Sequence, residues 1–95
     1  MDNFEPLDPL LHSQLRLAVM SLLISLEDAE FTFIKEKTQA TAGNLSVQLD
    51  KLDQAGYISI SKSFKGKRPL TTCKITTTGI KAFEAYVLAL KKYLP

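Results

Sequence analysis

The first long apolar pattern of the chain predicts an amphipathic helix over residues 8–26. Asp8 can cap the start of this helix, and Pro9 suits the first helical position, where its missing N–H costs nothing. Apolar side chains recur on one face at steps of three and four residues, the spacing of a helix that packs on a core. They are Leu11, Leu15, Ala18, Val19, Leu22 and Leu26.

A second apolar stripe runs along the opposite face of the same helix. It consists of Leu10, Leu17, Met20 and Ile24. A helix that is apolar on two faces must be covered on both of them. A short chain can cover only one face with its own core, so the second stripe is a candidate subunit interface.

The middle of the chain predicts an extended segment followed by a brief helix. The extended segment, at residues 31–33, comes directly after the acidic run E-D-A-E. Thr32 can cap the helix that follows it, at residues 33–39, because its hydroxyl can accept from a free backbone N–H of the first turn.

Another helix is predicted at residues 42–55, after a tight turn. Thr41 can cap its start, with Asn44 at the third position, and Gly56 ends it. Its apolar face is narrow, so most of its outer surface is polar and built from small side chains. The residues of the apolar face are Leu45, Leu49 and Leu52.

Residues 57–77 predict an antiparallel β-hairpin. In Y-I-S-I-S-K-S-F, Ile58 and Ile60 alternate with polar side chains, and in L-T-T-C-K-I-T-T, Cys73 and Ile75 share one face. Alternation with a period of two among β-branched residues is typical of strands. The residues K-G-K-R-P, which interrupt the alternation, supply the turn.

A last helix is predicted at residues 78–94. Its apolar side chains repeat with alternating steps of three and four, a heptad-like pattern that suits docking against another helix. They are Ile80, Phe83, Val87, Leu90 and Leu94. Together with the second stripe of the first helix, they form the predicted interface of a homodimer.

Composition places the chain among ordinary globular proteins. Its 95 residues fit one domain, and the 45% hydrophobic and 23% charged fractions suggest neither disorder nor a fibrous class. No apolar run is long enough to span a membrane, and the start M-D-N-F-E is acidic where a secretory signal is basic. We therefore expect a cytoplasmic protein without membrane contact, and the single Cys73 fits a reducing compartment.

Charge is divided unevenly between the two halves of the chain. Residues 1–53 contain nine acids and four bases, whereas residues 54–95 contain one acid and eight bases. Six cations and no acid lie between residues 54 and 83. Such asymmetry favours a polyanionic partner, although a basic face can also be merely solvated.

Catalytic and metal-binding patterns are missing from the sequence. There is no Ser-His-Asp arrangement and no phosphate-binding glycine loop, and Glu27 and Asp28 fit a solvated turn. One histidine, His12, and one cysteine, Cys73, far apart in the chain, do not make a zinc pattern. We expect no enzymatic activity, no metal and no cofactor.

The predicted order is helix, short strand, helix, turn, helix, hairpin, helix, which is a helix-turn-helix followed by a wing. The runs G-N-L-S-V-Q-L-D-K-L-D-Q-A-G-Y-I, S-K-S-F-K-G-K-R-P and T-x-x-x-I-T-x-x-G closely resemble the small winged-helix transcriptional regulators of the MarR and ArsR group, across residues 7–94. The resemblance implies an α+β fold, mostly α, with a three-helix core, a β-hairpin wing and a C-terminal dimerisation helix. A single domain over residues 1–95 would hold all of these elements.

The resemblance also implies that helix 42–55 is a recognition helix lying in the major groove of double-stranded DNA. Its side chains suit that role: Asn and Gln can pair with adenine, Ser can contact phosphate or base, and Val can pack on a thymine methyl group. Lysine suits phosphate, and so do Thr and the first amides of the helix. The expected DNA-binding residues of this region are Thr41, Asn44, Ser46, Val47, Gln48 and Lys51.

The hairpin tip would be the wing, lying along the DNA backbone or in the minor groove. Lys65, Lys67 and Arg68 surround Gly66, and Arg68 suits a narrow minor groove because a guanidinium is weakly hydrated. We expect Lys62 and Lys74 on the strands to extend this positive strip. The alternative is a hairpin tip that its lysines merely keep soluble.

Two departures limit what the resemblance implies. In the family, the position of Gln48 is often histidine, so base preference is not transferable from relatives. Asp50 and Asp53 would repel phosphate if they faced it. We expect them to lie toward the C-terminal half of the helix, away from the DNA backbone, which limits the footprint to the first two turns.

These observations predict a homodimeric, sequence-specific DNA-binding regulator. Repression by occupancy of a roughly palindromic operator is the simplest mechanism. The alternative function is a winged-helix module that docks an acidic protein surface through the same basic strip and does not bind DNA specifically.

Overall fold

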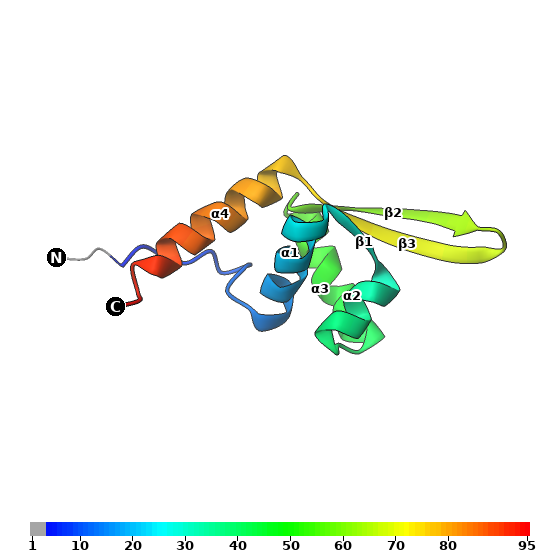
Figure 1. The fold of residues 1–95 in the computed structure, drawn as a ribbon, viewed down its shortest axis with the longest axis horizontal. Helices are drawn as coiled ribbons and strands as arrows, with labels where there is room; N and C mark the ends of the chain where they lie inside the picture. The colour runs from blue at the N-terminus through cyan, green and yellow to red at the C-terminus, as the bar shows by residue number, and fades with distance from the viewer. Residues whose placement is uncertain (1–3) are drawn as a thin grey trace.

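The computed structural model describes residues 4–95 and is an α+β winged helix (Figure 1), which confirms the predicted fold class. Three strands form one antiparallel sheet in the order β1-β3-β2. The elements are α1 (Gln14–Leu26), β1 (Asp28–Glu30), α2 (Phe31–Thr38), α3 (Ala42–Gln54), β2 (Ile58–Lys65), β3 (Arg68–Ile75) and α4 (Thr77–Lys91).

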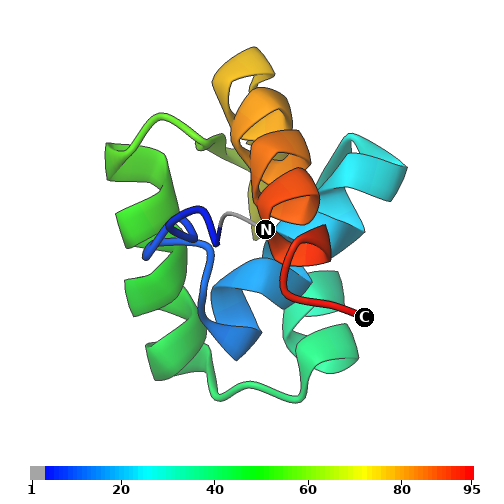
Figure 2. The same cartoon turned by 90° about the vertical axis from the view of Figure 1, so that its left-hand side faces the viewer.

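The molecule is elongated, with principal extents of 59 × 25 × 21 Å. The hairpin of β2 and β3 extends from one side of the helices and α4 extends from the other (Figure 1). Seen along the long axis, α3 lies at the outer edge of the helices (Figure 2). The hairpin and one helix of the helix-turn-helix are therefore both accessible from outside.

One hydrophobic core joins the helices to the base of the sheet. The narrow apolar face of α3 is buried in it, as the sequence predicts, and the other helices, the three strands and Leu11 in the turn before α1 supply the remainder. The largest fully buried side chains are Leu11, Val19, Met20, Leu23, Ile34, Leu45, Leu52, Ile58 and Cys73.

Threonine side chains cap the two helices that frame the hairpin. Thr41 accepts from the backbone N–H of Asn44 at 3.2 Å at the start of α3. Thr76 accepts from the N–H of Gly79 at 3.0 Å at the start of α4 and donates to the Gly56 carbonyl at 2.6 Å. Gly56 has a φ of +79°, which suits glycine and turns the chain from α3 toward β2.

The first helix begins at Gln14, so the prediction of a helix from residue 8 is wrong. Asp8 caps a separate turn: its carboxylate accepts from the Leu10 N–H at 2.9 Å, and its carbonyl accepts from two further N–H groups. The Tyr57 hydroxyl donates to the same carboxylate at 2.5 Å. Ser13, with an extended backbone (φ −151°, ψ 128°), separates this turn from α1.

The short strand is Asp28–Glu30 and not residues 31–33, which form the first turn of α2. The aromatic run F-T-F suggested an extended segment, but pairing with β3 decides which residues form the strand. Ala29 lies opposite Cys73 and is buried, while its acidic neighbours point to solvent. Gln39, with a φ of 60°, ends α2 at Thr38.

The core-facing side of α1 lies between the two predicted stripes. Val19, Met20 and Leu23 are buried, which places the core on the arc between the stripes. Met20, expected at a subunit interface, is 0% exposed and has no surface to offer a partner. Leu26, expected in the core, is 47% exposed. The other helix and strand ends differ from the prediction by at most three residues.

Candidate nucleic-acid interface

The outer surface of α3 carries the side chains expected to read DNA. Asn44, Ser46, Val47 and Lys51 are exposed, with Val47 at 51%, and Gln48 is partly buried. The opposite face of the helix anchors it in the core, so this surface is presented on a fixed support. The helix is thus one-sided, as its sequence indicates.

Gln48 is held by a hydrogen-bond network that the sequence did not reveal. The Arg16 Nη1 on α1 donates to Gln48 Oε1. Gln48 Nε2 donates to Asn44 Oδ1 at 3.0 Å, one helical turn earlier. Arg16 Nε also donates to the Leu10 carbonyl at 2.5 Å. In the sequence, Arg16 stands out only as the first Lys or Arg of the chain, with no other Lys or Arg before Lys35.

The wing ends in a two-residue turn that displays cations. Gly66 and Lys67 connect β2 to β3, and the φ of +66° at Gly66 matches the first turn position of a type II′ hairpin. Lys65 pairs with Arg68 across the turn, so Lys65, Lys67 and Arg68 gather at one exposed tip. Here the structure brings three of the predicted DNA-binding residues together.

The sequence did not predict a role for an aromatic side chain just behind the tip. Phe64 lies opposite Pro69 in the hairpin and is 72% exposed. Its place in the period-two alternation puts it on the same face as Ile60 and Lys62, beyond the edge of the core. An apolar ring on a basic wing is a candidate for contact with sugars or bases.

The two strand lysines expected to extend the positive strip lie on different faces of the sheet. Lys62 shares a face with Ile58 and Ile60, whereas Lys74 lies on the other face of the sheet, because successive side chains alternate. Lys74 is also directly opposite the acidic Asp28 on β1. By the same alternation, Lys65 and Arg68 at the tip share the face of Lys74, so Lys62 is the one cation of β2 and β3 that lies on the α3 side of the sheet.

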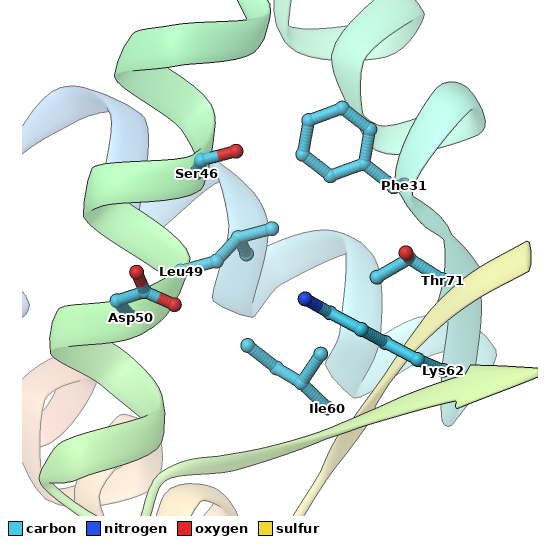
Figure 3. A pocket seen from close by; sticks show the side chains of 7 residues that line it. All are labelled: Phe31, Ser46, Leu49, Asp50, Ile60, Lys62 and Thr71. Atoms are coloured by element: carbon cyan, nitrogen blue, oxygen red, sulfur yellow. The ribbon is translucent and has the colours of Figure 1, made fainter.

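A cleft of about 300 Å³ separates α3 from the hairpin (Figure 3). The Lys62 side chain reaches from β2 across this cleft toward α3, and Asp50 borders the cleft from the helix (Figure 3). Asp50 is thus on the hairpin side of α3 and reduces the positive potential deep in the cleft. The remaining lining residues are Phe31, Ser46, Leu49, Ile60 and Thr71.

Two groups outside this surface have perturbed acidity, and neither is suited to chemistry. A hydrogen bond to the Asp8 carboxylate, together with burial, raises the pKa of Tyr57 to about 12. Burial raises the pKa of the Cys73 thiol to about 11, so the thiol stays protonated at neutral pH. Within residues 4–95, no three His, Cys, Asp or Glu side chains are grouped closely enough to hold a metal ion.

An apolar groove lies on the side of the molecule away from the wing. Ile24 on α1 and Phe83, Val87 and Leu88 on α4 line this groove of about 460 Å³, with Glu84 at its edge. Leu88 is 62% exposed and was absent from the heptad-like pattern read in the sequence.

The other residues predicted at the subunit interface divide into two groups. Ile80 and Leu94 are exposed on α4 and just beyond it. Leu10, Leu17 and Leu90 are partly buried against the core.

None of the helices in the described part of the chain is both long and apolar enough to cross a membrane.

Comparison with known proteins gives one family and several structural neighbours. Residues 15–94 match the family described as "Winged helix DNA-binding domain". An uncharacterized protein of Methanocaldococcus jannaschii is 40% identical over 76 residues, which are 80% of this chain and 83% of that protein. The transcriptional regulator homologue protein from Pyrococcus horikoshii OT3 superposes with a TM-score of 0.84 at 27% identity, over 90% of this chain and 84% of that chain.

A more distant neighbour is a mutant MarR from E. coli complexed with operator DNA. It superposes with a TM-score of 0.72 at 21% identity, over 92% of this chain and 67% of that chain, which shows a common fold. The predicted resemblance to winged-helix regulators with MarR-family neighbours is confirmed. The matched family is one of DNA-binding domains and not of enzymes.

Proposed function

Because the chain belongs to the winged helix DNA-binding domain family, we propose that it is a transcriptional regulator that binds double-stranded DNA sequence-specifically as a homodimer. The observation that carries this proposal is the pairing of an exposed polar face on α3 with a cationic hairpin tip. The shared fold of the MarR mutant that was solved with operator DNA supports it.

In the proposed complex, α3 enters the major groove. Asn44, Ser46, Val47 and Gln48 face the base edges, where hydrogen bonds and methyl contacts carry sequence information. Lys51 and the first turn of α3 at Thr41 contact phosphates, which position the protein without reading sequence.

The wing makes the second set of proposed contacts. Lys65 and Lys67 neutralise backbone phosphates, and Arg68 enters the minor groove, where its planar group loses less hydration than an ammonium does. Lys62, reaching across the cleft toward α3, is suited to a phosphate between the two grooves. All four cations lie on the hairpin that extends from the helices (Figure 1).

The proposed dimer covers the apolar groove of α1 and α4 with a second copy of the chain. Leu88 is largely exposed, and Ile24, Phe83 and Val87 border the same groove, a grouping that a monomer leaves in water. Ile80, Leu90 and Leu94 extend this surface along α4. Two-fold pairing would set two recognition helices about one turn of DNA apart, and bound dimers would repress by blocking polymerase.

Selection from a pool of randomised duplexes tests the DNA-binding function. We expect enrichment of a palindromic site whose half-sites are separated by about 10 base pairs. A pool that remains unenriched, together with binding to acidic proteins, would favour the alternative function of a protein-docking module. Salt dependence alone does not separate the two functions, because both are electrostatic.

A double variant, Ile24→Glu with Leu88→Glu, tests the dimer. It places two carboxylates in the groove, so we expect a monomer by sedimentation or light scattering. Leu26→Glu is the matched control, since Leu26 is an exposed leucine on α1 that borders a different surface, beside β1 and β3. A double variant that still forms dimers would move the interface elsewhere.

A further inference from the structure

We propose that Arg16 fixes the orientation of Gln48 and thereby directs the recognition helix toward guanine instead of adenine. This inference rests on the proposed function, because it concerns how the same surface reads DNA. Arg16 acts here as a positioning residue on α1, behind the helix that contacts the bases.

The direction of the network follows from the chemistry of its first member. A guanidinium has only donors, so the Gln48 atom that faces Arg16 is the acceptor Oε1. The amide nitrogen of Gln48 therefore faces Asn44. Because that nitrogen donates, the Asn44 atom that receives it is Oδ1. Arg16 thus orients the amide of Gln48, and Gln48 in turn orients the amide of Asn44.

More donors than acceptors are left free on this surface. Gln48 retains one N–H and Asn44 retains both N–H groups of Nδ2, while each amide oxygen already accepts one hydrogen bond and keeps one lone pair. Guanine presents two acceptors in the major groove, O6 and N7, whereas adenine presents one acceptor and one donor. Bidentate pairing with adenine requires the amide oxygen, which in Gln48 is turned toward α1. Under this inference, Gln48 therefore pairs with guanine in place of the adenine expected from the sequence.

Arg16 is itself held in place. Its Nε donates to the Leu10 carbonyl at 2.5 Å, in the turn that Asp8 organises and that Tyr57 holds. The guanidinium is partly buried between this turn and α3, so rotation of Gln48 away from it would leave an N–H with reduced access to water. The donor-presenting arrangement is therefore the preferred one before DNA arrives.

Selection of bound duplexes at low salt, where phosphate contacts sustain binding, tests the inference with three proteins. For the wild-type chain we expect guanine over adenine by about tenfold at the position contacted by Gln48, the usual size of one base contact. Arg16→Met keeps the aliphatic length but removes the donors, so the guanine-to-adenine ratio should fall to about one or below. Gln48→Glu keeps a partner for Arg16 but presents only acceptors, so cytosine, whose N4 donates, should replace guanine.

The readout is a base ratio at one position, which a general loss of stability does not change. Ser21→Ala, at an exposed residue of α1 that lies about 140° around the helix from Arg16, is the matched control and should keep the wild-type preference. Thermal unfolding identifies any variant that does not fold. If Arg16→Met does not fold, Gln48→Glu alone decides.

Adenine at this position in the wild-type selection, or an unchanged base ratio in a folded Arg16→Met, would overturn the inference. An unchanged preference in Gln48→Glu would overturn it as well. If a palindrome is enriched but the guanine-to-adenine ratio is the same in the variants as in the wild-type protein, this inference is refuted and the proposed function stands. A wild-type pool without any enriched sequence removes both.

Discussion

Replacing Gly79 by alanine should weaken the attachment of α4 to the rest of the domain. A Cβ atom at this position would lie 2.1 Å from the carbonyl oxygen of Tyr57, 2.9 Å from its carbonyl carbon and 3.1 Å from Ile75 Cγ1. The Tyr57 carbonyl cannot rotate away freely, because it also accepts from the Thr76 N–H at 3.1 Å. The start of α4 or the chain at Tyr57 must therefore move.

Two opposing terms set the size of the effect. Alanine is favoured over glycine inside a helix by about 0.8–1 kcal/mol. Overpacking of this kind costs about 1–3 kcal/mol, and more where the obstructing atoms belong to the backbone. We expect Gly79→Ala to lower the free energy of unfolding by about 2 kcal/mol, which for a domain of this size lowers Tm by about 10 °C.

Gly43→Ala supplies the matched control for this measurement. Gly43 is also helical, in the first turn of α3, but a Cβ there would meet no atom within 4 Å. Without a clash, only the helical preference remains, so this variant should gain about 0.5 kcal/mol. Thermal unfolding of both variants at one protein concentration is the assay. A Gly79→Ala protein that melts at or above the wild-type temperature would refute the reasoning.

Three further predictions concern the wing and the two perturbed acids. Changing Lys67 and Arg68 together to Ala should weaken binding to every duplex. The slope of log K against log salt should fall by about 1, because Lys67 neutralises one phosphate while Arg68 enters the minor groove; unchanged non-specific affinity would mean that the wing does not touch DNA. The raised pKa of Tyr57, about 12, means that its bond to Asp8 stabilises the fold below pH 10 and that this stability disappears as pH rises from about 10 to 12. Tyr57→Phe should remove that part of the pH dependence in chemical denaturation, and a wild-type curve in the variant would contradict the assignment. Cys73, whose pKa is about 11, should react with a thiol reagent at pH 8 only after denaturant is added, and immediate labelling of the native protein would argue against its burial.

The sequence predicted the elements that short-range patterns determine. The narrow apolar face of α3 and its Thr41 cap are visible within a few residues, and the hairpin follows from a period of two around Gly66. Because these signals are local, the helix-turn-helix and the wing were located within a few residues of their positions.

The errors concern residues whose state depends on distant partners. Asp8 looks like the cap of a long helix until its carboxylate is seen to accept from Tyr57, 49 residues away. The strand at Ala29 exists because β3 pairs with it, although its acidic neighbours have low strand propensity. Gln48 meets Arg16 across 32 positions, a contact that no spacing rule predicts.

The two proposed surfaces are joined by α1. Arg16 faces α3 near the start of this helix, and Ile24 borders the apolar groove eight residues later, about 12 Å along the axis. A helix packed along that length moves nearly as a unit, so a shift of α1 on pairing of two chains also shifts Arg16 relative to Gln48. Linkage then requires reciprocity: if pairing favours the orientation of Gln48 that suits the operator, the operator favours pairing by the same factor. Under the two proposals, base preference and dimer stability are therefore coupled properties of one helix.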